Sequence, residues 1–232
     1  MGIILGYISL ICFCLLAAKW ITRKLHLEKV DKFLMRIHKK VGATFLVACV
    51  LHIALAVPVF KTRSIYVLIT GSMVVAAVIL LIIFCHVMKN NAIKLRWHRI
   101  FTTVILIFII CHMIAYFIDF ANYQKKIKEI HIQNIDVSEV EDGTYTGEYD
   151  AGYIYAKVEV TVADGKITEL RILEHDNERG EKAEIITEKM LEEQKIDVDA
   201  VTGATNSSKV IKMAVQNALF TGTDITDGHS QH

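Results

Sequence analysis

Four histidines within or beside apolar segments form two pairs with the same spacing. His38 precedes His52 by fourteen positions, and His98 precedes His112 by fourteen. In an α-helix this spacing is about 40° short of whole turns, so both members of a pair lie on one face, about 21 Å apart. Imidazole is a common axial ligand of haem iron, and ionisable side chains in a membrane helix are usually functional. Two such helices side by side therefore offer two stacked bis-histidine sites.

The elements that must position these histidines are apolar stretches near the ~20 residues that a membrane-spanning helix requires. They cover residues 3–20, 41–60, 65–88 and 100–118. A cleaved signal peptide explains the first stretch poorly, because residues 1–5 contain no basic residue and no Ala-x-Ala-like site precedes Lys19. We therefore predict a four-helix membrane bundle in residues 1–120, a linker in 121–141, a small α+β domain in 142–220 and a polar tail in 221–232. Residues 122–133 are also compatible with an extension of the fourth helix.

Basic residues in the short loops predict the orientation, because they favour the cytoplasmic side. They are concentrated in the loops after the first and the third helix: Arg23, Lys24, Lys29, Lys32, Arg36, Lys39, Lys40, Lys89, Lys94, Arg96 and Arg99. The middle loop has only Lys61 and Arg63. This places the N-terminus and the α+β domain outside the cytoplasm in the cell membrane, although three lysines after the fourth helix point weakly the other way.

The same orientation matches the histidines by depth. The second and fourth helices run in one direction, so His38 and His98 lie on the cytoplasmic side and His52 and His112 in the outer half. The inner two also fit a simpler interpretation, as residues of the headgroup zone. The outer two need a partner in hydrocarbon. His86 is a competitor for the inner site, a quinone-site donor or a helix-end residue.

This arrangement of histidines resembles the ferric reductase and NADPH oxidase superfamily of transmembrane haem proteins. The resemblance covers residues 1–120 and implies two b-type haems, an inner one at His38 and His98 and an outer one at His52 and His112. The chain differs from that family in having four apparent spans instead of six. It also has no cytosolic flavin and nicotinamide domain, so the resemblance does not identify the electron donor.

The α+β domain begins where the composition shifts to charged and β-branched residues. Residues 143–149, 154–162 and 167–175 have the pattern of strands, and Asp164-Gly165 is the favoured turn of a hairpin. Residues 180–194 and 207–219 have helical spacing. Between these helices lies Asp199-Ala-Val-Thr-Gly-Ala-Thr205. Its small residues and the following helix N-terminus suit a phosphate group, but its hydroxyl residues equally suit a plain helix cap.

This segment resembles the flavinylation motif Asp-x-x-Ser/Thr-Gly-Ala-Thr of the FMN-binding domains in the sodium-pumping NADH:quinone oxidoreductase and the Rnf complex. The resemblance implies a phosphoester between Thr205 and FMN, made by a flavin transferase. Asp199 belongs to the transferase recognition element, and Thr202, Gly203 and Ala204 shape the loop around the flavin phosphate. The resemblance also places Glu174 and His175 near the flavin ring, although the usual proline-glycine feature there is replaced by residues 177–180.

The combined expectation is a flavocytochrome that carries electrons outward through two b haems to covalent FMN and then to an external acceptor. The donor is either a quinol or a cytoplasmic reductase, the surrounding partner is membrane lipid, and no nucleic-acid partner is expected. Two alternatives remain open at this point. One is a quinol-linked subunit of a larger membrane complex, and the other is a haem or flavin redox sensor.

Overall fold

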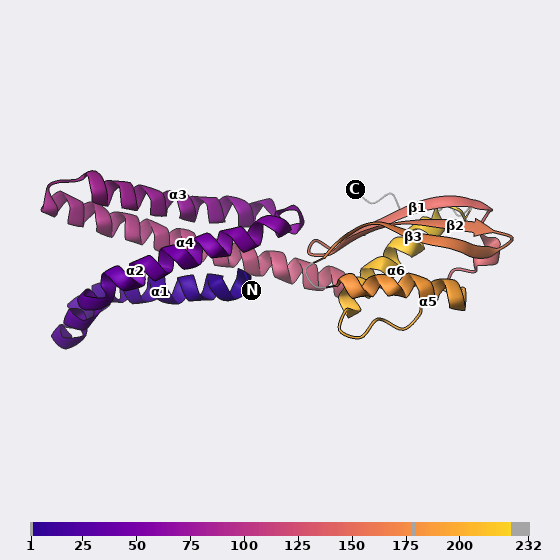
Figure 1. The fold of residues 1–232 in the computed structure, drawn as a ribbon, viewed down its shortest axis with the longest axis horizontal. Helices are drawn as coiled ribbons and strands as arrows, with labels where there is room; N and C mark the ends of the chain where they lie inside the picture. Colours follow the sequence, from indigo (N-terminus) through magenta and orange to yellow (C-terminus); the bar gives the residue numbers. More distant parts are fainter. Residues whose placement is uncertain (1, 178–179, 224–232) are drawn as a thin grey trace. The chain divides into compact units, whose positions relative to one another are not determined.

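The computed structural model describes residues 2–177 and 180–223, and the chain forms two compact units (Figure 1). The first unit comprises Met1–Lys61 and Thr70–Ile110, and the second comprises Thr62–Ile69 and Cys111–His232. Most of the predicted polar tail, residues 224–232, lies outside the described residues. Each unit has its own cluster of buried side chains.

Four helices are long and apolar enough to cross a membrane, as the sequence predicts. They are α1 (Gly2–Lys24), α2 (Glu28–Ala56), α3 (Ile65–Val87) and α4 (Asn91–Glu129). A 3-10 helix, η1 (Val57–Thr62), follows α2 and contains Pro58, the only proline of the chain. Because proline has no backbone N–H, α-helical hydrogen bonding does not continue through it.

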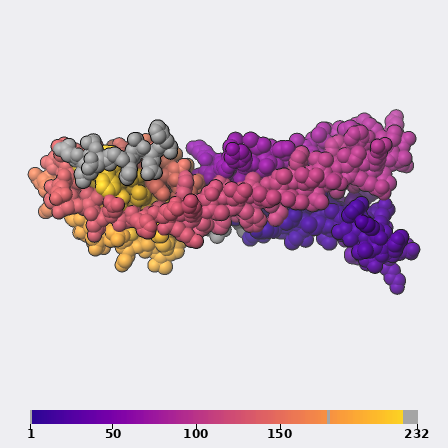
Figure 2. Space-filling model, turned by 180° about the vertical axis from the view of Figure 1, so that it is seen from behind, coloured from indigo at the N-terminus to yellow at the C-terminus, as the bar shows by residue number. Residues whose placement is uncertain are grey.

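The first unit has a small buried cluster to which all four helices contribute. Cys12 and Phe13 come from α1, Phe45 from α2, Ala77 from α3 and Ile105 from α4. The Phe13 and Phe45 rings lie 6.0 Å apart between centroids. Most other large apolar side chains of these helices are exposed. Figure 2 shows one face of the helices in space-filling form, coloured indigo to magenta. Such a surface fits a bundle surrounded by lipid.

The second unit contains a three-stranded antiparallel sheet with the strands in sequence order. The strands are β1 (Gly143–Asp150), β2 (Tyr155–Ala163) and β3 (Lys166–Asp176). The turn between β2 and β3 has positive φ at both central residues, 52° at Asp164 and 68° at Gly165. This is the backbone that an Asp-Gly turn favours in a two-residue hairpin, so the hairpin prediction is confirmed.

Helix α6 (Thr205–Phe220) covers the buried face of the sheet. Every second residue of β2 is buried, from Ala156 to Val162, as expected for a strand with one solvated face. At Gly147 of β1, a Cβ atom would collide with the backbone of Ala214 and Ala218 in α6, so only glycine allows this close approach. Two short helices, η3 (Glu181–Ile185) and α5 (Ile186–Glu193), connect β3 to the loop before α6.

The C-terminal end of α4 belongs to the core of the second unit. Tyr123, Ile127 and Ile130 are buried together with the sheet and α6. Val137 and Val140, at and beside the 3-10 helix η2 (Val137–Glu139), join the same core. The segment 121–141, assigned to a linker in the sequence analysis, is therefore a packed part of this unit. Its apolar residues repeat at helical spacing and continue the helix that the fourth membrane span begins.

Candidate functional site

The inner histidine pair meets within the first unit. His38 of α2 and His98 of α4 are both half-buried, and their ring centroids lie 6.1 Å apart with an interplanar angle of 65°. A metal–nitrogen bond of about 2 Å and the roughly 1 Å from a ring nitrogen to its centroid separate two trans imidazoles by about 6 Å. Because each ring can rotate about its metal bond, the interplanar angle is compatible with ligation. The pair therefore has the spacing of axial haem ligands.

Cys85 of α3 contacts this pair, which the sequence analysis did not anticipate. Its Sγ lies 3.6 Å from Nδ1 of His98. Metal-binding histidines usually use their second ring nitrogen in such an outer contact, which fixes the orientation of the ring. The contact leaves Nε2 of His98 for a ligand. His86, the competitor named from the sequence, is exposed at the end of α3.

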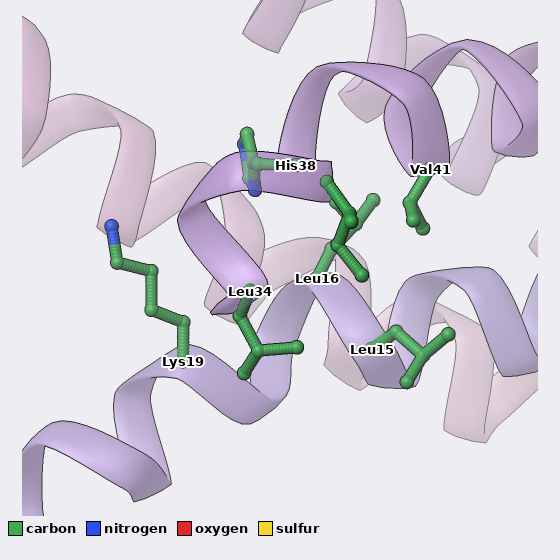
Figure 3. Close-up of a pocket in the computed structure, with 7 residues that line it drawn as sticks. Leu15, Leu16, Lys19, Leu34, His38 and Val41 are labelled. Carbon is green, nitrogen blue, oxygen red and sulfur yellow. The ribbon is translucent and has the colours of Figure 1, made fainter. Parts of the chain in front are cut away.

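A cationic side chain from α1, Lys19, lies near the inner histidine pair. Lys19 and His38 line one small pocket between α1 and α2 with the apolar residues Leu15, Leu16, Leu34, Ile37 and Val41. In Figure 3, Lys19 and His38 lie toward one side of this pocket and Leu15 and Val41 toward the other. The sequence analysis did not associate Lys19 with the histidines, because its position relative to α2 depends on how the two helices pack.

His52 of α2 has a fixed tautomer in the first unit. Its Nδ1 lies 2.8 Å from the carbonyl oxygen of Gly2, and since a carbonyl only accepts, Nδ1 donates and Nε2 carries the free lone pair. A Cβ atom at Gly6 would lie 3.2 Å from Cε1 of the same ring, so α1 needs a small residue there. His112 is half-buried on α4 in the second unit. The pairing of His52 with His112 stays a prediction.

No cluster of three or more His, Cys, Asp or Glu side chains that could hold a metal ion occurs among the described residues. A bis-histidine haem does not need such a cluster, because the macrocycle supplies the other iron ligands. The spacing of the inner histidine pair is therefore compatible with haem.

The loop that carries the flavinylation motif leads directly into α6. Gly203 has φ of 77°, the left-handed conformation that glycine adopts without strain. The N–H of Ala204 donates to the Val201 carbonyl, and Thr205 is the first residue of the helix. The side chains of Asp199, Thr202 and Thr205 are exposed. An exposed Thr205 hydroxyl at the positive end of a helix is accessible to an enzyme that attaches a phosphate ester.

Two buried polar side chains of α6 hold this loop in place. The hydroxyl oxygen of Ser208 accepts a hydrogen bond from the Val201 N–H at 3.0 Å. The amine of Lys212 donates to Asp197 Oδ1 at 2.7 Å and to the Val198 carbonyl at 2.9 Å. Sequence reasoning missed the role of Lys212, since a single lysine on an otherwise apolar helix face gives no signal of its long-range partner.

The start of η3 lies beside the flavinylation loop and the first turn of α6. A Cβ atom at Gly180 would collide with the side chain of Ser207, and a Cβ atom at Gly203 would lie 3.4 Å from Nζ of Lys182. Lys182 therefore places a cation next to the loop that precedes Thr205. The sequence analysis did not single it out.

The two residues predicted near the flavin ring differ in their surroundings. Glu174 is exposed, whereas the His175 side chain is only 2% exposed and its Nδ1 lies 2.9 Å from Oε1 of Glu184. Its Nε2 is buried without a hydrogen-bond partner among the described residues. A buried ring nitrogen of this kind usually has a partner, so a bound group fits here.

Comparison with known families supports the flavin interpretation. Residues 152–220 match the family model of the FMN-binding domain, which covers β2 to α6 and includes the loop at Thr205. An FMN-binding domain is therefore present, and four apolar helices precede it. No curated protein and no solved structure matches this chain.

Proposed function

We propose that this chain is a membrane flavocytochrome that carries electrons through two b-type haems to FMN attached to Thr205. The observation that carries this proposal is the exposed Thr205 hydroxyl at the start of α6, inside a segment that matches an FMN-binding domain. An FMN-binding domain suggests flavin-linked electron transfer. The spacing of the inner histidines supports the haem part of the proposal.

The residues around Thr205 suit the attachment and retention of FMN. In attachment, the Thr205 hydroxyl would lose its proton and its oxygen would bond to the flavin phosphorus, while the group that this phosphorus carried in the transferase's flavin donor would leave. Exposed Asp199 is available to the transferase. Lys182 and the free N–H groups of the first turn of α6 neutralise the phosphate. Gly203 provides the left-handed backbone turn of the loop, and Lys212 and Ser208 fix the position of the loop. When bound, FMN exchanges electrons singly or in pairs.

The inner haem would be held between α2 and α4 by His38 and by Nε2 of His98. Cys85 orients the His98 ring, and Lys19 provides a cation for an anionic propionate on the cytoplasmic side. The outer haem would be held by His52 and His112. The Gly2 carbonyl selects the His52 tautomer that leaves Nε2 free to ligate iron.

The proposed direction of transfer follows from the basic loops. Residues 21–40 and 89–99 carry most of the basic loop residues, which supports a cytoplasmic position for the inner histidines. The FMN-binding domain then lies outside the cytoplasm. The donor is a quinol or a cytoplasmic reductase, and the acceptor is an external molecule that takes electrons from exposed FMN. The flavin transferase acts on the same outer side.

The cofactor content of the purified full-length chain tests this proposal. We expect two haems per chain from oxidised and reduced absorption spectra, and flavin fluorescence that stays with the denatured polypeptide. Thr205→Ala removes this fluorescence, whereas Thr144→Ala, at an exposed strand position of the same domain, keeps it. His38→Ala and His112→Ala each remove one haem, and His131→Ala removes none. A haem-free parent chain contradicts the flavocytochrome, and covalent flavin in Thr205→Ala contradicts the attachment site.

A further inference from the structure

A line of aromatic side chains runs along the outer end of α4, within the second unit. Tyr116, Phe120 and Tyr123 follow His112 at spacings of four, four and three positions, which places all four residues on one face of the helix. The rise from His112 to Tyr123 is about 17 Å. The line therefore begins at the level of the proposed outer haem ligand and ends in the core of the FMN-binding unit.

The rings in this line are in contact with one another. Tyr116 and Phe120 are stacked with centroids 6.3 Å apart, and Phe120 lies 6.1 Å from Tyr123. Tyr153, in the loop between β1 and β2, extends the line. Its centroid is 4.8 Å from Tyr123 in a stacked arrangement and 5.9 Å from Phe120. All these distances lie within the range of interacting aromatic pairs.

The line reaches the flavinylation loop through one hydrogen bond. The side-chain amide of Asn206 donates to the Tyr123 hydroxyl oxygen at 2.9 Å. Asn206 directly follows Thr205, so covalent and hydrogen bonds connect the proposed attachment site to the aromatic rings. Tyr123 and Tyr153 are each only 7% exposed, so this end of the line is shielded from solvent.

We propose that Tyr116, Phe120, Tyr123 and Tyr153 form the bridge through which electrons pass from the haem level of His112 to the flavin at Thr205. This inference rests on the proposed function. One electron leaves the ferrous haem iron, which is oxidised, and is taken up by the flavin, which is reduced. The rings couple the two centres and are themselves neither oxidised nor reduced.

The surroundings of Tyr153 favour a bridge over a tyrosine that is itself oxidised. The guanidinium carbon of Arg63 lies 3.6 Å from the ring centroid, and a cation over the ring opposes removal of an electron from it. Burial raises the pKa of the Tyr153 phenol well above its usual value, so the phenol keeps its proton. Both effects keep the ring in its neutral, reduced state.

A membrane-interface belt is the simpler explanation of aromatic residues at the end of a spanning helix. Belt residues expose their rings on the outside of the protein, and Phe117 is 51% exposed. Tyr123 and Tyr153 are instead buried within the protein, and Tyr123 bonds to the residue after Thr205. The belt accounts for Phe117 and does not account for this connection.

Ring removal in the full-length chain, carrying haem and flavin in lipid nanodiscs, tests the bridge. Phe120→Leu and Tyr123→Leu remove rings from the line, and Phe117→Leu removes a neighbouring ring that contacts only Tyr116 among the described rings. Tyr123→Phe keeps the ring and loses the hydroxyl. After photoreduction of the haem, haem oxidation and flavin reduction are followed at separate wavelengths. Cofactor content and both midpoint potentials are measured in each variant, so that unequal loading or driving force is recognised.

We expect Phe120→Leu and Tyr123→Leu to slow haem-to-flavin transfer by about tenfold at unchanged potentials, and Phe117→Leu to leave the rate unchanged. Tyr123→Phe retains most of the rate. Phe120 is 39% exposed, so its variant remains informative even where Tyr123→Leu fails to load flavin. If Phe120→Leu carries both cofactors and transfers electrons from haem to flavin at the parent rate, the bridge is wrong. The proposed function is unaffected by that outcome.

A haem-independent measurement separates failure of the bridge from failure of the proposed function. An excited flavin takes an electron from a tyrosine that is coupled to it, which shortens the flavin emission lifetime. In haem-free, flavin-loaded protein, Tyr123→Leu and Tyr123→Phe lengthen this lifetime, and Phe117→Leu does not. An unchanged lifetime in Tyr123→Leu overturns the coupling. A parent chain that binds no haem, with the lifetime effect present, overturns the flavocytochrome while the coupling at the flavin end stands.

Discussion

Lys212 ties the middle of α6 to the segment that precedes the flavinylation loop. Its Nζ donates to Asp197 Oδ1 at 2.7 Å and to the Val198 carbonyl at 2.9 Å, while its side chain is only 9% exposed. The Asp197 side chain is 54% exposed, so solvent screens this ion pair. The buried bond to the Val198 carbonyl contributes more, because this oxygen would otherwise lose its partner.

Replacement of Lys212 by methionine, which keeps the length of the side chain and removes the donor, should loosen this loop. We expect a loss of about 1–3 kcal/mol in the free energy of unfolding of the FMN-binding unit, from the unpaired carbonyl. We also expect a lower fraction of flavinylated Thr205. Chemical denaturation and in-gel flavin fluorescence measure the two effects. The control Lys195→Met removes an exposed pair with Glu193, so equal losses in both variants would contradict the role assigned to Lys212.

Gly147 is required for the contact between β1 and α6. In Gly147→Ala the new methyl group meets the backbone of Ala214 and Ala218, which cannot move independently of the helix. We expect a destabilisation of about 1–3 kcal/mol or more, typical of overpacking. Gly42→Ala is the matched control, because no atom lies within 4 Å of its Cβ position. Thermal unfolding followed by circular dichroism should show a lower midpoint in Gly147→Ala, and an unchanged midpoint would refute this contact.

The Tyr155 phenol should remain protonated to unusually high pH. Its hydroxyl donates to Oε2 of Glu148 at 2.7 Å, and this hydrogen bond raises the pKa of Tyr155 from 10.0 to about 12. Because the folded-state pKa is raised, the resulting stability is present below about pH 10 and is lost as the pH rises towards about 12. Ultraviolet titration of phenolate formation measures this shift. Glu148→Gln should return the Tyr155 pKa towards 10, and identical titration curves would exclude the effect.

Parts of this architecture follow from local sequence, and parts depend on packing between distant segments. The Asp164-Gly165 hairpin has a local cause in turn chemistry, and the four apolar helices have one in hydrophobic length. Helix α6 has one in the helical spacing of its buried apolar residues. The sequence also predicts that His38 and His98 lie at one level, and the structure brings their rings together. Their role as haem ligands stays a prediction.

The contacts of Cys85, Lys19 and Lys212 could not be predicted in this way. Each joins different elements, and the rotation of one helix against another decides which side chains meet. The composition of segment 121–141 also failed to indicate that this segment packs into the core of the second unit. Its lysines and acidic residues have the composition of a linker, yet Tyr123, Ile127 and Ile130 repeat at helical spacing and are buried in the second unit. Spacing was the better indicator there, because a helix needs only one apolar face to pack.

Cys85 should tune the proposed inner haem through its contact with His98. Cys85→Ala removes the sulfur that lies 3.6 Å from Nδ1, so the imidazole loses an orienting contact. Loss of such outer contacts typically lowers metal affinity by about tenfold or more. Haem titration of apo-protein in detergent should show weaker binding at one of two sites. The control is Cys49→Ala, which replaces a half-buried cysteine on α2. Equal haem affinity in the parent, Cys85→Ala and Cys49→Ala chains would show that Cys85 has no role in haem binding.

Gly6 should be necessary for the outer haem and dispensable for the inner one. A Cβ atom at this position lies 3.2 Å from Cε1 of His52, so the branched side chain in Gly6→Leu displaces the imidazole and breaks its hydrogen bond to the Gly2 carbonyl. We expect the haem content to fall from two per chain to one, with the remaining haem sensitive to His98→Ala. Gly42→Leu, where no atom lies near the Cβ position, should keep both haems. Two haems in Gly6→Leu with an unchanged spectrum would show that His52 does not ligate iron in the tautomer and position described above.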